Sequence, residues 1–157
     1  MPANLDLTEE AAPPGGFFAL GCRLLLVDSI TEAVGSGHGC VVVSGSHGGL
    51  SAARFALQAG VRLAVFNDAG IGKDGAGIAG LAWLQQHGVA AVAVAHCTAR
   101  IGEASSTWDD GIISAVNERA SSLGARIGLA LKPWLLGSSL DGLGVSGSRS
   151  ARSPGRR

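Results

Sequence analysis

The chain has 157 residues, of which 46% are hydrophobic and 15% are charged. This size and composition are typical of one globular domain with a substantial buried core. Twelve basic and twelve acidic residues give a formal net charge of zero, which argues against a basic nucleic-acid-binding domain and predicts no nucleic-acid partner.

The amino-terminal segment, residues 1–16, contains Pro-Pro-Gly-Gly and little apolar pattern, so we expect it to be disordered. It lacks the basic start and apolar run of a signal peptide, and no stretch of the chain reaches the roughly 18 apolar residues of a membrane span. The three cysteines, Cys22, Cys40 and Cys97, form no CxxC pair. The sequence therefore predicts a cytoplasmic protein with reduced thiols and no membrane partner.

Four short apolar runs alternate with segments of helical periodicity. Each run is continuous rather than alternating, which is typical of parallel strands that are covered on both faces. We expect an α/β fold over residues 17–136, a three-layer, Rossmann-like domain with a mostly parallel sheet of four to five strands. The short connection over residues 29–39 leaves open whether the first run is instead an edge strand. The runs occupy residues 23–28, 40–44, 61–68 and 89–96.

Apolar residues at helical spacing predict a helix after each of the last three runs. The first helix begins near Leu50 and ends at Gly60, and the second ends at Gly88. The third is expected to start with a capping box at Thr107 and to end at Gly124. Its apolar stripe would be Ile112, Ile113, Val116, Ala120 and Leu123.

The carboxyl-terminal part is expected to add a fifth short strand over residues 127–131. Residues 137–157 are rich in glycine and serine and end with several arginines. Such a composition is typical of a solvated, disordered tail, and we assign it no function.

Polar side chains follow all four predicted strands. Ligands of open parallel sheets bind at the carboxyl ends of the strands, where loops and helix amino termini converge. The first strand ends in Asp28, and the other three run into longer polar segments over residues 44–49, 67–75 and 96–103. The turns at the opposite ends carry few such groups, so the sequence predicts a small-molecule site at the carboxyl edge.

The segment after the second strand, SGSHGG, surrounds a histidine with glycines. Glycines let the backbone approach a ligand closely, so that N–H groups can hold an anion or a developing oxyanion. His47 is a candidate acid or base, and Ser46 is a candidate nucleophile. A tight turn that only caps the next helix is the alternative. The predicted anion-binding residues are Ser44, Gly45, Gly48 and Gly49.

The segment after the third strand, NDAGIGKDGAG, supplies a carboxylate and an amine. We predict that Asp68 transfers a proton or orients His47, and that Asn67, Lys73 and Asp74 bind substrate. An Asx turn at the first two residues of the segment is the alternative. The glycine spacing matches a dinucleotide fingerprint, but acidic residues stand where pyrophosphate would lie, so no cofactor is predicted.

The segment after the fourth strand contains His96 and Arg100, which we predict to bind substrate. Cys97 is a further nucleophile candidate, although neighbouring residues of a strand point to opposite faces and would not pair with each other. The four histidines form no HxH or HExxH element, so no metal site is predicted.

Together these patterns favour an enzyme that acts on a polar, anionic small molecule by hydrolysis or by proton-transfer chemistry of the lyase or isomerase kind. Two alternatives remain open, a non-catalytic subunit that binds a metabolite or nucleotide and a structural subunit. A homo-oligomer is expected, because a core of this size offers little depth for a pocket unless a neighbouring copy adds a wall.

Overall fold

The computed structural model describes residues 18–141, so the predicted disorder of residues 1–16 lies outside the described residues. The last helix, α6 (Leu131–Asp141), continues past the predicted start of the tail at residue 137, and residues 142–157 also lie outside the described part. Within the described part no helix is long and apolar enough to cross a membrane.

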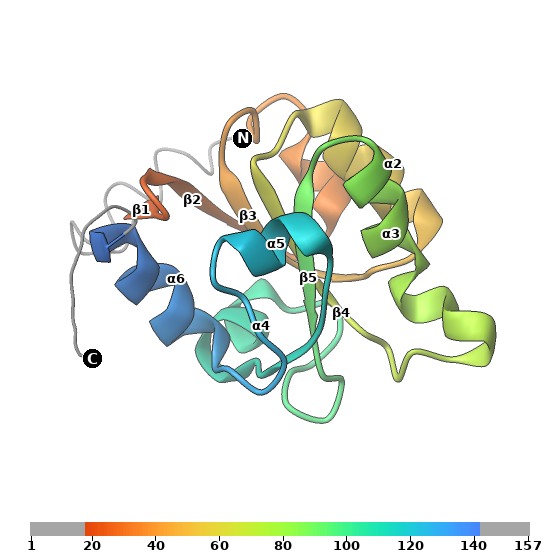
Figure 1. Cartoon of the computed structure of the whole chain (residues 1–157). Coiled ribbons are helices and arrows are strands. Elements are labelled where there is room, and N and C mark those ends of the chain that lie inside the picture. Colours follow the sequence, from red (N-terminus) through yellow and green to blue (C-terminus); the bar gives the residue numbers. More distant parts are fainter. Residues whose placement is uncertain (1–17, 142–157) are drawn as a thin grey trace.

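The fold is α/β, with one mostly parallel sheet and helices around it (Figure 1), as the sequence predicts. The strands are β1 (Phe18–Ala19), β2 (Cys22–Val27), β3 (Val41–His47), β4 (Leu63–Asn67), β5 (Ala90–Val94) and β6 (Ile113–Val116). The helices are the 3-10 turns η2 (Ile30–Ala33) and η3 (Lys73–Ile78), and the α-helices α2 (Leu50–Ala59), α3 (Ala79–Gln86), α4 (Ala104–Asp110), α5 (Glu118–Ser122) and α6.

Strands β2 to β5 are parallel and lie side by side in chain order. Strand β6 pairs antiparallel with β5, and the two-residue strand β1 pairs antiparallel with β2 at the other edge. This arrangement is consistent with a Rossmann-like α/β fold. In doubly wound sheets a ligand crevice forms where the strand order reverses. The order does not reverse between β2 and β5, so this crevice is absent there. Any site between these strands must be formed by the loops of neighbouring strands.

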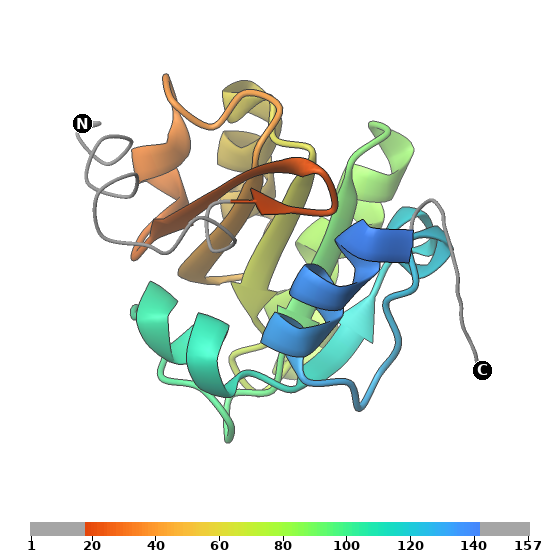
Figure 2. The same cartoon turned by 90° about the vertical axis from the view of Figure 1, so that its left-hand side faces the viewer.

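Alternate residues of the strands enter two hydrophobic clusters, as the two-residue period of a strand requires. One cluster contains Val42 and Phe66 together with buried residues of η2, α2 and α3. The other contains Val41 and Val65 together with Trp108 of α4 and Trp134 of α6. Figure 2 shows α4 and α6 on the near side of the sheet and α2 and α3 behind it.

The predicted helix from Thr107 to Gly124 is wrong. Helix α4 ends at Asp110, the chain then forms strand β6, and the short helix α5 follows. The apolar stripe fits a helix by spacing, but pairing with β5 over Ile113–Val116 overrides the local pattern. The predicted strand over residues 127–131 is also wrong, because only one isolated bridge, Ile112 to Ala130, forms there before α6 begins.

Helix α2 ends at Gly60 as predicted, with that glycine in the left-handed conformation. Leu50 at its first position is exposed, and small residues form its buried face. The buried residues are Ala52, Ala53, Ala56 and Ala59. Small side chains let α2 lie close to α3, where Gly80 contacts the backbone of Gly49 so closely that a side chain would not fit.

The first apolar run, now β2, pairs parallel with β3 on one side and with only the two-residue strand β1 on the other. The short connection between these strands folds as the 3-10 turn η2, whose Ile30 and Ala33 are buried in the cluster beneath α2. A single 3-10 turn is therefore enough for this crossover.

Candidate functional site

The carboxyl ends of the four parallel strands lie at one edge of the sheet, because strands β2 to β5 run in the same direction. Asp28, His47, Asp68 and His96 all stand at or just after these ends. The loop that follows β5 crosses this edge toward β2. Its Gly102 N–H donates to the Gly45 carbonyl at 2.7 Å, and the Ala104 N–H donates to Asp28 Oδ1 at 2.9 Å.

Asp68 is the most extensively hydrogen-bonded carboxylate of this edge, and its side chain is only 5% exposed. Its Oδ1 accepts hydrogen bonds from the Gly70 N–H at 2.7 Å, the His96 N–H at 3.0 Å and the His96 ring Nδ1 at 3.2 Å. Its Oδ2 accepts a hydrogen bond from the Ser114 hydroxyl at 2.7 Å. Donors from three separate segments thus converge on one buried carboxylate.

Two opposing effects act on the pKa of Asp68. Burial raises it, but hydrogen bonds from Ser114, from the Gly70 and His96 N–H groups and from the His96 ring outweigh burial, so the pKa is lowered from its ordinary value of 3.8. The carboxylate is therefore ionised at neutral pH. It can stabilise positive charge on the ring of His96.

His96 presents its ring to solvent, with 60% of the side chain exposed, while Nδ1 contacts the buried carboxylate. An ionised carboxylate can only accept hydrogen bonds, so Nδ1 must carry the proton of this contact. In the neutral ring the lone pair is then on Nε2. A buried carboxylate that fixes an exposed imidazole in this tautomer is the geometry of a general base.

The sequence prediction paired Asp68 with His47, and the structure places His96 at this position instead. The His47 Nδ1 accepts a hydrogen bond from the Gly49 N–H at 3.2 Å, so the proton of a neutral His47 ring is on Nε2. The two histidines therefore have opposite tautomers. His96 offers a proton acceptor at this edge, and His47 offers a hydrogen-bond donor.

Ser114 is a residue of this cluster that the sequence prediction missed. It lies on β6, next to β5, and its hydroxyl also contacts the Ala93 carbonyl at 3.4 Å. The predicted helix over this segment placed it away from the sheet. In the structure buried Ile113 and Ala115 alternate with half-buried Ser114 and Val116, as on a strand, but the sequence Ile-Ser-Ala-Val alone does not show this alternation.

The loop after Asp68 has an unusual backbone. Ala69, Ile71 and Asp74 have φ values of 51°, 67° and 56°, in the left-handed region that side chains with a Cβ rarely adopt. The loop is held by hydrogen bonds to Asp68, from the Gly70 N–H to the carboxylate and from the Ile71 N–H to the carbonyl at 2.6 Å. Backbone strain of this kind clusters at functional sites in proteins.

The predicted anion-binding N–H groups of the glycine segment are already occupied. The Gly45 N–H donates to the Asp28 carbonyl at 3.1 Å, the Gly48 N–H to the Asn67 carbonyl at 3.1 Å, and the Gly49 N–H to His47. Gly48 and Gly49 are buried, and a Cβ on either would press against a neighbouring element. These glycines therefore allow close packing and do not form an anion cradle.

The Ser46 side chain is hydrogen-bonded within the fold. Its Oγ accepts a hydrogen bond from the Ile30 N–H at 2.9 Å, which fixes the turn after β2. Within the described part of the chain no hydrogen bond joins this hydroxyl to a histidine, so the structure does not supply the base that a serine nucleophile needs.

Two of the predicted substrate-binding residues are buried and bonded within the fold. The Ser44 hydroxyl donates to the Val65 carbonyl at 2.8 Å. Asn67 donates to the Ala99 carbonyl at 3.0 Å and accepts from the Ala69 N–H at 2.8 Å, which is the Asx turn considered as an alternative. Both residues support the loops of the edge and do not face a ligand.

The charged candidates are on the surface. Lys73 and Asp74 are exposed in the loop after β4. Arg100 is 78% exposed and pairs with Glu103 at 3.6 Å. These side chains can reach a ligand at the edge, and none of them is fixed toward one.

A hollow of about 360 Å³ lies at the same edge between the ends of β2 and β3 and the loop after β5. Its lining includes polar groups and the apolar side chains of Phe55 and Ile101. The polar residues of the lining are Asp28, Ser29, Thr31, Ser46, His47 and Ser51. This volume is within the range of small-molecule sites.

No group of three potential metal-ligating side chains occurs within residues 18–141. No protein-family model matches the chain, and neither a curated protein nor a solved structure matches it significantly.

Proposed function

We propose that this three-layer, Rossmann-like α/β domain is an enzyme that acts on a polar, anionic small molecule, with His96 as the general base. The observation that carries the proposal is the contact of a buried, ionised Asp68 with Nδ1 of an exposed imidazole. Solvent exposure of the ring makes Nε2 accessible to a substrate. A histidine that only supported the fold would not need its ring at the surface.

Each residue has a role that follows from its hydrogen bonds. Nε2 of His96 accepts a proton from water or from a substrate C–H, and Asp68 stabilises the imidazolium that forms. Ser114 keeps the carboxylate in position through Oδ2. The Nε2–H of His47 donates to a substrate oxygen on which negative charge develops. Hydrolysis and proton-transfer lyase or isomerase chemistry both need these two functions.

The surroundings of the base favour a small ligand with both polar and apolar parts. Leu50, Ile71 and Ile101 are exposed aliphatic residues that follow β3, β4 and β5 at the same edge. Together with the adjacent hollow they offer apolar contact, and exposed Lys73 offers a cation for an anionic group. We further propose a cytoplasmic homo-oligomer, since the described cysteines are free and a neighbouring copy would deepen the open edge.

The test is a thermal-shift screen of carboxylates, phosphates and nucleotides followed by turnover assays on each ligand that binds. His96→Gln should lower kcat by at least about 100-fold while the ligand still binds, because it removes the base and keeps the overall size. Asp68→Asn should also lower kcat. The matched control is His38→Gln, an exposed histidine that precedes β3 at the opposite edge, and it should turn over at the wild-type rate.

Turnover by His96→Gln at the wild-type rate would contradict the proposed base. Ligands that bind without any turnover would favour the alternative of a non-catalytic subunit. If no ligand raises the melting temperature and the protein forms a large assembly, the alternative of a structural subunit would be favoured.

A further inference from the structure

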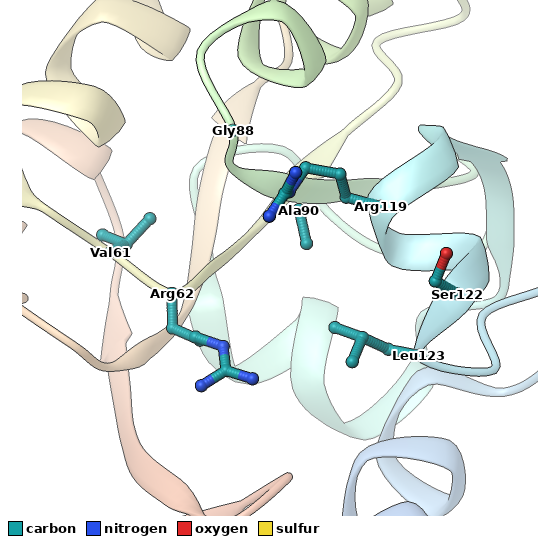
Figure 3. Close-up of a pocket in the computed structure, with 7 residues that line it drawn as sticks. All are labelled: Val61, Arg62, Gly88, Ala90, Arg119, Ser122 and Leu123. Atoms are coloured by element: carbon teal, nitrogen blue, oxygen red, sulfur yellow. The ribbon is translucent and has the colours of Figure 1, made fainter.

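A second hollow lies at the opposite edge of the sheet, at the amino ends of β4 and β5 (Figure 3). Its volume is about 430 Å³, larger than the hollow beside His47. Residues just before or at the start of these strands form one wall, and helix α5 with the residue after it forms the other. The lining residues are Val61, Arg62, Gly88, Ala90, Arg119, Ser122 and Leu123.

Two arginines from different elements stand on two sides of this hollow. Arg62 precedes β4, and Arg119 lies on α5, as the sticks of Figure 3 show. Both residues are exposed. They are far apart in the sequence, and the fold brings them to one cavity.

Neither guanidinium has an acidic partner within residues 18–141. Arg62 contacts only the weak acceptor Cys22 Sγ, at 3.9 Å, and the hydrogen bond of Arg119 to Gln85 at 2.8 Å uses its backbone N–H. Among the described residues no carboxylate lines the hollow, and the neighbouring Glu118 lines a different cavity. Arg100, by contrast, pairs with Glu103. Two guanidiniums without such a pairing at one hollow therefore form a local positive charge with unused donors.

The remaining lining is mostly apolar and includes Val61, Ala90 and Leu123. The Ser122 hydroxyl donates to the Glu118 carbonyl at 3.2 Å, so the guanidiniums are the main free donors. A phosphate monoester has about two negative charges at neutral pH, which match two arginines, and it presents three oxygens to their planar donors. A carboxylate has half that charge.

We propose that this hollow binds the phosphate group of a small organic phosphate monoester, with Arg62 and Arg119 on the phosphate and the apolar lining on the organic part. The site is separate from the His96 cluster, because the two lie at opposite edges of the sheet. It does not depend on the proposed enzyme activity.

The experiment uses the full chain with phenyl phosphate and benzoate, which share an aromatic body and differ in the anion. Each is titrated while methyl signals of Val61, Ala90 and Leu123 are followed by NMR. Phenyl phosphate should shift these signals in a saturable way and bind at least about tenfold more tightly than benzoate. Arg62→Gln and Arg119→Gln should each weaken its binding by about tenfold or more.

Two control variants distinguish binding at this hollow from general attraction to positive charge and from binding at the carboxyl edge. Arg54→Gln removes the same charge from an exposed arginine of α2, whose Cζ lies 5.8 Å from the centroid of the Trp83 ring. This variant should bind phenyl phosphate as tightly as the wild type. His96→Gln should also leave binding unchanged. Equal weakening by Arg54→Gln would show attraction to overall charge only. Absence of saturable shifts, or benzoate binding as tightly as phenyl phosphate, would likewise overturn the proposal.

Discussion

Replacement of Asp68 by asparagine tests the hydrogen-bond network at the carboxyl edge. Asparagine keeps the shape, and its Oδ1 can still accept from the Gly70 N–H, the His96 N–H and the His96 ring. The charge is lost, and an NH₂ group replaces the Oδ2 that now accepts from Ser114. Hydrogen bonds to charged groups contribute about 1.5–3 kcal/mol each, against about 0.5–1.5 for neutral ones.

Three retained but weakened bonds and one disrupted bond would together cost several kcal/mol, and the easier burial of a neutral amide offsets part of this. We therefore expect Asp68→Asn to lower the free energy of unfolding by about 1–3 kcal/mol. Urea denaturation followed by tryptophan fluorescence measures the change, because Trp108 and Trp134 are buried in the core.

Asp74→Asn is the matched control, since it removes the same charge from an exposed residue of the same loop. Its φ of 56° is one that asparagine tolerates, so the change should stay within about 0.5 kcal/mol. Equal stability of the wild type and Asp68→Asn, or equal losses in both variants, would refute the argument that the buried carboxylate organises this edge.

Because the pKa of Asp68 is lowered in the folded state, its ionised form stabilises the protein above the ordinary value of 3.8, and this contribution is lost as the pH falls through the lower folded value. In urea titrations, the difference in free energy of unfolding between the wild type and Asp68→Asn should become smaller as the pH falls below 3.8. A difference that does not change with pH would contradict the lowered pKa of Asp68. Gly80→Ala places a Cβ 2.5 Å from the Gly49 carbonyl oxygen and 2.8 Å from Ala53 Cβ. This substitution should therefore lower the free energy of unfolding by about 3 kcal/mol or more. In Gly102→Ala the new Cβ meets no atom within 4 Å, so the free energy of unfolding should fall by only about 1–2 kcal/mol, because alanine is strained in this left-handed backbone. Equal decreases for the two variants in thermal or urea unfolding would contradict the packing argument.

The parallel strands could be predicted from the sequence because their signal is local. Continuous β-branched runs such as Val41–Val43 are buried on both faces, and helix α2 after this run is capped at its carboxyl end by Gly60. The α/β class and the gathering of polar loops at one edge follow from that pattern. Strand β6 could not be recognised in this way, because Ile112, Ile113 and Val116 also fit a helical stripe and only pairing with β5 decides between them.

The partner of Asp68 could not be read from the sequence for a similar reason. His47 ends β3 and His96 follows β5, and these two strands flank β4, so chain order alone allows either histidine to reach the carboxylate. The choice depends on the Gly49 N–H, which binds the His47 ring, and on the loop after β5, which places both the N–H and the ring of His96 on Asp68. These contacts are set by the three-dimensional paths of the loops.

The most direct test of the proposed base is the tautomer of His96, measured by long-range ¹H–¹⁵N NMR at basic pH. The structure predicts the Nδ1–H form for His96 and the Nε2–H form for His47. In Asp68→Asn the preference of His96 should weaken. A wild-type His96 ring that is mainly in the Nε2–H form would contradict the account, because the nitrogen that faces solvent could then not accept a proton.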